Sequence, residues 1–235
     1  GLAVAARYQP TPAGAEVGGD WYDAFTLPDG TLVLSIGDVA GHDLPAAVTM
    51  GHVRTMLRGF AVDTRASAGA TLQRLDAALQ TLYEDRTATC VLGRIDVLDD
   101  GSATLDYAVA GHLPPLLVES DGTTRFLEGH RHPLLGATAE MDYEHDIETL
   151  PHGSTLLLYT DGLIELRGEH LERGLERLQT MASALATTPV ETFCDELLAN
   201  LPIAGDDDIA LIAVRVPGED SRHAEGPGTP KERER

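Results

Sequence analysis

The amino-acid sequence predicts an α+β fold in which two antiparallel β-sheets pack face to face, with a pair of helices on each outer side. Two observations support this α-β-β-α sandwich. Consecutive strand-like runs are joined by hairpin turns, which is typical of antiparallel sheets. Two pairs of helical patterns interrupt the strands without regular strand–helix alternation, which disfavours a doubly wound parallel sheet. Because a helix pair cannot lie within a sheet, we expect the pairs to cover its outer faces.

The first half of the chain runs from strands into the first helix pair. Residues 2–8 are strand-like, and residues 21–27 and 31–39 form a hairpin across the turn Pro28-Asp29-Gly30. Apolar residues then recur at three- and four-residue spacing. This spacing predicts two helices, over residues 47–60 and 72–82.

The second half is richer in strands and ends with the second helix pair. Turns that contain Asp-Gly separate residues 88–97 from 103–110 and residues 116–119 from 123–127. We place Asp121 in the second of these turns, with no chemical role. The remaining strands are expected over residues 142–150, 154–160 and 209–216. Helical stripes predict helices over residues 171–185 and 190–201.

The length and composition indicate one globular domain with a tail. The chain has 235 residues, of which 43% are hydrophobic and 23% are charged. We expect a folded domain over residues 1–217 and a disordered tail over residues 218–235, because the tail is charged and nearly free of large apolar side chains. Since the chain begins directly with a strand, we expect it to be part of a longer protein, with a homodimer formed through the missing N-terminal region.

The charge balance excludes several classes of partner. Lys and Arg number 17 against 38 Asp and Glu, a net charge of −21, so the surface repels phosphate backbones and anionic membranes. The apolar runs are too short to span a bilayer, and there is no signal-peptide pattern. Only Cys90 and Cys194 are present, which indicates a reducing compartment. We therefore expect a cytoplasmic protein that binds neither nucleic acid nor membrane.

Carboxylates stand where predicted strands begin or end. Asp20 follows two glycines and precedes a strand, Asp38 and Asp161 end apolar strands, and Asp207 and Asp208 precede the last strand. An isolated Asp of this kind is usually a turn residue. Four such sites can instead converge at one rim of a sandwich, where like charges need a cation to offset them. Oxygen ligands select Mg²⁺ or Mn²⁺, and two such ions can activate a water for attack on a phosphate ester.

Five strings in the sequence resemble one known family. They are V-G-G-D-W-Y-D (17–23), I-G-D-V-A-G-H (36–42), A-G-H-L-P-P-L-L (110–117), L-L-L-Y-T-D-G-L-I-E (156–165) and D-D-I-A-L (207–211). In this order they are similar to the bacterial SpoIIE/RsbU-type serine/threonine phosphatases, a branch of the metal-dependent protein phosphatase 2C (PP2C) superfamily. The resemblance extends over residues 2–216 and implies the same α-β-β-α sandwich.

The resemblance also implies an activity and a site. The activity is hydrolysis of a phosphoserine or phosphothreonine ester on a protein by a water activated by two Mn²⁺ or Mg²⁺ ions. The implied substrate is a phosphorylated STAS-domain protein, an anti-sigma factor antagonist, so the chain would act in sigma factor regulation. The implied metal ligands are Asp20, Asp38, the Val39 carbonyl, Asp161 and Asp207, with Asp208 as a supporting carboxylate and with Asp38 and Asp161 as the catalytic residues.

Two alternatives stay open at this point. Asp38 falls on the position of the ligand that bridges the two ions; eukaryotic members of the superfamily have Asp-Gly-His there, whereas this chain has Asp38-Val39-Ala40. Either His42 or His112 is a candidate general acid, and a plain turn role fits both. The second alternative is a catalytically weak or silent signalling module of the same fold that binds a regulatory partner.

Overall fold

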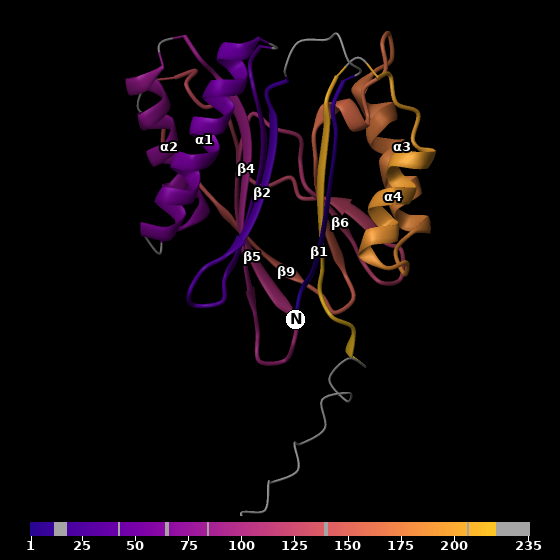
Figure 1. The fold of residues 1–235 in the computed structure, drawn as a ribbon. Helices are drawn as coiled ribbons and strands as arrows, with labels where there is room; N and C mark the ends of the chain where they lie inside the picture. Colours follow the sequence, from indigo (N-terminus) through magenta and orange to yellow (C-terminus); the bar gives the residue numbers. More distant parts are fainter. Residues whose placement is uncertain are drawn as a thin grey trace, which may run out of the picture.

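The computed structural model is a four-layered sandwich, with two β-sheets between two helix pairs (Figure 1). It describes residues 1–11, 18–41, 43–63, 66–83, 85–138, 141–205 and 207–219. The α-β-β-α architecture predicted from the sequence is therefore confirmed.

The two sheets are formed from distant parts of the chain. The first sheet has the order β1-β11-β10-β6-β7. Its strands are β1 (Ala3–Gln9), β11 (Ile209–Arg215), β10 (Thr155–Tyr159), β6 (Leu116–Val118) and β7 (Thr124–Phe126). The second sheet has the order β2-β3-β4-β5-β8, and β9 pairs with β5. Its strands are β2 (Asp20–Thr26), β3 (Leu32–Val39), β4 (Ala88–Val97), β5 (Ala103–Ala110), β8 (Arg131–His132) and β9 (Asp146–Leu150).

Each helix pair covers the outer side of one sheet. Helices α1 (Leu44–Asp63) and α2 (Ala68–Leu82) cover the second sheet, and α3 (Leu171–Ala184) and α4 (Val190–Asn200) cover the first (Figure 1). A short 3₁₀ turn, η1 (Asp161–Leu163), follows β10 directly.

Three hydrophobic layers hold the sandwich together. The central layer lies between the sheets and includes Leu34, Ile36 and Ile212, none of which is exposed. The two outer layers lie under the helix pairs, one around Cys90 and the other around Cys194. Because strands covered on both faces have no solvent side, β3 and β11 are apolar along most of their length, as the sequence shows.

Some element boundaries differ from the sequence-based prediction. The strand expected from residue 142 begins at Asp146. The two-residue strand β8 pairs with β5 in parallel, and neither it nor η1 was predicted, since two or three residues carry no periodic signal. Residues 220–235 of the predicted tail lie outside the described residues, so the domain boundary stays a prediction. Among the described residues, no helix is both long and apolar enough to cross a bilayer.

Candidate metal centre

The hairpin of β2 and β3 places two of the predicted ligands directly opposite each other. Asp20 and Asp38 are paired in the antiparallel register, an arrangement that is unfavourable for two like charges. Asp20 is only 4% exposed. Burial and the charges of Asp38, Asp161 and Asp207, partly offset by a hydrogen bond from Thr160, raise the pKa of Asp20 to about 8. The hairpin alone therefore concentrates negative charge at this end of the sandwich.

One oxygen of this pair has no partner in the described part of the chain. The Oδ2 atom of Asp20 is buried and accepts no hydrogen bond from any described residue. A buried polar atom of this kind is costly unless something binds it. A hard divalent cation is the type of ligand that a buried carboxylate oxygen among other carboxylates accepts. The donor set around Asp20 therefore fits a metal ion.

The two glycines before Asp20 let the chain pass close to the predicted ligands. A Cβ atom on Gly19 would overlap the Val39 carbonyl oxygen and the Asp38 carboxylate, and one on Gly18 would overlap the Asp208 carboxylate. The backbone N–H of Val39 also donates to the Gly19 carbonyl at 3.2 Å. Glycine is therefore required at both positions before Asp20, because a side chain there would overlap the groups that the backbone approaches.

The first sheet contributes Asp161 from the turn that follows β10. Its Oδ1 accepts a hydrogen bond from the Gly162 N–H at 2.9 Å. Burial and the charge of Glu165 raise the pKa of Asp161. Burial and the charges of Asp161, Asp207 and Asp208 likewise raise the pKa of Asp38, to about 7. The two sheets therefore place their carboxylates within electrostatic reach of each other.

The start of β11 contributes two carboxylates with different surroundings. Asp207 is exposed and lines a small cavity of about 190 Å³ together with Gly162 and Glu165. Asp208 is buried, and its Oδ1 accepts hydrogen bonds from the Thr11 N–H at 2.8 Å and the Thr11 hydroxyl at 2.6 Å. The Tyr8 hydroxyl donates to Oδ2 of Asp208. Burial opposes ionisation of Asp208, but these hydrogen bonds outweigh it and lower the pKa. Both of its oxygens are thus bonded within the protein.

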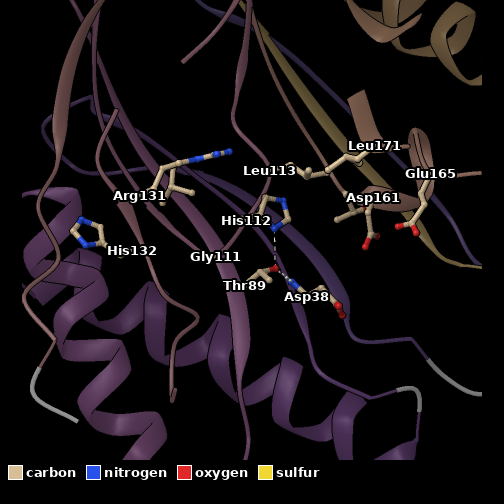
Figure 2. Close-up of a pocket in the computed structure, with 12 residues that line it drawn as sticks. Asp38, Thr89, Gly111, His112, Leu113, Arg131, His132, Asp161, Glu165 and Leu171 are labelled. Atoms are coloured by element: carbon tan, nitrogen blue, oxygen red, sulfur yellow. Dashed lines mark hydrogen bonds between the residues drawn. The ribbon is translucent and has the colours of Figure 1, made fainter. Parts of the chain in front are cut away.

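The predicted residues are near one another but do not all share one cavity. Asp38 and Asp161 line a cavity of about 410 Å³, here called the central cavity (Figure 2). Asp207 lines the neighbouring small cavity, and Asp20, which is buried, lines neither of the two. No three His, Cys, Asp or Glu side chains of the described residues gather into a ready-made metal cluster. The ligand set stays a prediction.

A hydrogen-bonded relay connects the two halves of the site. The Asp38 N–H donates to the Thr89 hydroxyl oxygen at 3.0 Å, and this hydroxyl contacts Nδ1 of His112 at 2.8 Å (Figure 2). Nε2 of His112 lies 3.0 Å from the Tyr159 carbonyl oxygen, which can only accept. The ring is therefore protonated at Nε2, and Thr89 donates to Nδ1. The relay links Asp38 on one sheet to the end of β10 on the other.

The relay argues against His112 as a general acid. Burial lowers the pKa of His112 to about 4, so the ring is neutral at pH 7. Its one N–H is already directed at the Tyr159 carbonyl. His42, the other candidate, lies outside the described residues. Neither Thr89 nor the relay was predicted from the sequence, because a threonine within a strand carries no local signal of function.

Comparison with known proteins decides the family. The family model for stage II sporulation protein E (SpoIIE) matches residues 28–217, most of the folded chain. The chain belongs to the SpoIIE family.

The curated relatives of this SpoIIE domain are longer proteins. Protein IcfG of Synechocystis is 30% identical over 230 residues, which cover 84% of this chain and 36% of IcfG. The phosphoserine phosphatase RsbU of Bacillus subtilis is 26% identical over 209 residues, which cover 85% of this chain and 60% of RsbU. The chain therefore spans less than two thirds of the length of either relative.

Solved structures confirm the fold of this SpoIIE domain as that of PP2C phosphatases. The RsbU and RsbW domains of a Mycobacterium tuberculosis protein match with a TM-score of 0.81 and 32% identity, over 93% of this chain and 60% of that chain. The PP2C phosphatase domain of Bacillus subtilis SpoIIE, with a regulatory fragment, matches with a TM-score of 0.77 and 19% identity, over 92% and 64%. RsbX, solved in complex with magnesium, has a TM-score of 0.69 at 15% identity, over 92% and 95%.

Proposed function

We propose that this SpoIIE domain is a metal-dependent phosphatase that hydrolyses phosphoserine or phosphothreonine esters on a protein. The observation that carries the proposal is the buried, unpartnered Oδ2 of Asp20 opposite Asp38, in a chain whose relatives include a named phosphoserine phosphatase. Such a carboxylate pair is costly in a protein of net charge −21 unless a cation binds it.

The proposed ligands supply only oxygen atoms, which favours two Mg²⁺ or Mn²⁺ ions over softer metals. The residues that would hold them are Asp20, Asp38, the Val39 carbonyl, Asp161 and Asp207. When bound, such ions supply an activated water and offset the charge of the phosphate. The structure of RsbX with magnesium supports a divalent cation in this fold.

The chain's own residues hold this arrangement in place. The Thr89–His112 relay fixes the backbone at Asp38 relative to the end of β10. Tyr8 and Thr11 hold Asp208, and with it the turn that carries Asp207. Asp38 and Asp161, the proposed catalytic residues, face the central cavity, whose volume of about 410 Å³ admits a phosphorylated side chain.

For the physiological substrate we propose a phosphorylated STAS-domain protein, an anti-sigma factor antagonist. The sequence resemblance to RsbU-type phosphatases supports this choice, as does the acidic surface, which disfavours nucleic acid as a partner. The homodimer and the cytoplasmic location stay predictions.

Hydrolysis of a phosphoserine peptide, measured with and without Mn²⁺, tests the proposal. We expect turnover that requires Mn²⁺ or Mg²⁺ and is abolished by a chelator. The thermal melting temperature of the metal-free protein should rise on addition of either ion, because the ions bind only the folded state. A melt unchanged by millimolar Mn²⁺, with no turnover, would contradict the proposal. Binding of a partner without turnover would instead favour the silent signalling module.

A further inference from the structure

The central cavity extends from the carboxylates to the far edge of the second sheet. Its lining includes Asp38 of β3, Thr89 of β4 and Arg131 of β8. Figure 2 shows the Arg131 side chain on one side of His112, reaching toward Leu113, while Asp161 lies on the other side. One cavity therefore contains both the proposed reaction centre and a distant guanidinium group.

Arg131 has an unusual electrostatic position. Among the described residues that line the central cavity, it is the only Lys or Arg, beside the carboxylates of Asp38, Asp161 and Glu165. Its side chain is exposed, and no hydrogen bond or ion pair ties it to another residue within the described ranges. The planar guanidinium is suited to bind a carboxylate through two parallel hydrogen bonds. An unpaired arginine here is therefore available to an anionic group of a ligand.

The strand register shows how far Arg131 lies from the proposed reaction centre. Arg131 is opposite Val109, Val109 is opposite Val91, and Val91 is opposite Ile36. Ile36 lies two residues before Asp38 on β3. Three inter-strand steps correspond to about 14 Å between backbones. The Arg131 side chain covers part of this distance, but it lies on the other side of His112 from Asp161 (Figure 2), where a second anionic group of the substrate can reach it.

We infer that Arg131 is a specificity residue that binds an Asp or Glu side chain close in sequence to the phosphorylated residue of the substrate. The inference rests on the proposed phosphatase function. An extended peptide advances about 3.3–3.6 Å per residue, so the acidic side chain lies within about four residues of the phosphoserine. The acidic partner offsets the positive charge of Arg131, while the phosphate occupies the other end of the central cavity.

Paired phosphoserine peptides test the inference. Each pair differs only in Glu or Ala at one of the positions flanking the phosphoserine, and kcat/KM is measured at saturating Mn²⁺. We expect the wild-type chain to prefer Glu about tenfold at one position, as for a hydrogen bond between charged groups. Arg131→Ala should bring the ratio close to one, and Arg131→Glu should favour a Lys peptide at the same position. Arg125→Ala is the matched control and should keep the wild-type ratio, because Arg125 is ion-paired with Glu148 outside this cavity.

Each preference is the ratio of two kcat/KM values measured with the same protein preparation, so it does not depend on the fraction of the protein that folds. A wild-type ratio of one at every position would overturn the assignment of Arg131. So would an Arg131→Ala variant that loses activity equally on both peptides of a pair, because Arg131 would then contact the phosphate itself. Absence of hydrolysis of every peptide by the wild-type chain would overturn the phosphatase function on which the inference rests.

Discussion

The two sheets hold their halves of the candidate metal centre in different ways. In the second sheet, Asp20 and Asp38 are opposite each other in a hydrogen-bonded hairpin, so the backbone ladder sets their spacing. In the first sheet, Asp161 begins a 3₁₀ turn and Asp207 lies before a strand, outside any ladder. Side-chain hydrogen bonds from β1 and the segment after it hold the Asp207–Asp208 turn instead.

This difference shows where the site is rigid and where it depends on single contacts. A backbone ladder is maintained by many hydrogen bonds, so the loss of one side chain changes it little. A turn held by a few side-chain donors can move when one donor is lost. Substitutions in the hairpin half should therefore affect the fold or the metal site as a whole, whereas those around Asp208 should adjust metal affinity.

The largest effect is expected from removal of one ligand. Asp161→Asn should lower turnover of a phosphoserine peptide at least about a hundredfold in saturating Mn²⁺, because it weakens one ion. The metal-free stability should hold or rise, since one negative charge leaves a crowded cluster. Asp121→Asn is the control, because Asp121 accepts a hydrogen bond from the Thr123 N–H in an exposed turn. Near-native turnover of the Asp161 variant would show that the site is wrongly assigned.

The half of the metal centre formed by the β2–β3 hairpin is best tested where the backbone at Gly19 approaches Val39. Gly19→Ala should reduce the free energy of unfolding by about 1–3 kcal/mol, because the new methyl group overlaps the Val39 carbonyl and neither backbone can move freely. Gly51→Ala in α1, where nothing lies within 4 Å of the added atom, should be neutral or stabilising. Chemical denaturation without metal measures both. Equal stability of the two variants would contradict the close approach.

The other half is tested at Tyr8. Tyr8→Phe removes the hydroxyl that donates to Asp208, while the two hydrogen bonds from Thr11 remain. We expect the Mn²⁺ concentration at half-maximal thermal shift to rise about tenfold, with little loss of metal-free stability. Tyr83→Phe is the control, since that hydroxyl contacts His52 at 2.5 Å. If both variants matched the wild type, the hydrogen bond to Asp208 would have no role in metal affinity.

The smallest effect is the pH dependence of the metal-free protein. The pKa values of Asp20, about 8, and Asp38, about 7, lie above the ordinary value of 3.8, so the folded state holds protons that the unfolded state releases. The free energy of unfolding should therefore fall as pH rises toward 8. Burial lowers the pKa of His112 from 6.5 to about 4, so between these pH values the unfolded state binds a proton that the folded state does not, and the free energy of unfolding rises with pH. Measurements above pH 6.5 therefore report the two carboxylates without a contribution from His112. Asp20→Asn should make the free energy of unfolding less dependent on pH in this range. If the variant showed the same pH dependence as the wild type, Asp20 would not be the cause of it.

The sequence by itself determined the order of the main elements and their classes. The bounds of β4 and β5 agree with the predicted residues 88–97 and 103–110, because hydrophobic patterns and Asp-Gly turns act over a few residues. Candidate carboxylates could be found in the same way, since each one borders an apolar strand. Local patterns could not separate Asp20 from Asp23, three residues later in the same motif. The structure does so, because Arg58 of α1 pairs with Asp23 at 2.5 Å.

Only the tertiary structure decided which distant residues meet. The relay from Asp38 through Thr89 and His112 to β10 joins two sheets, and the position of Arg131 depends on a two-residue strand beside β5. These contacts arise from long-range strand pairing and from the packing of one sheet on the other. Neither leaves a periodic trace in the sequence, because the partners are far apart along the chain and each alone is an ordinary strand or loop residue.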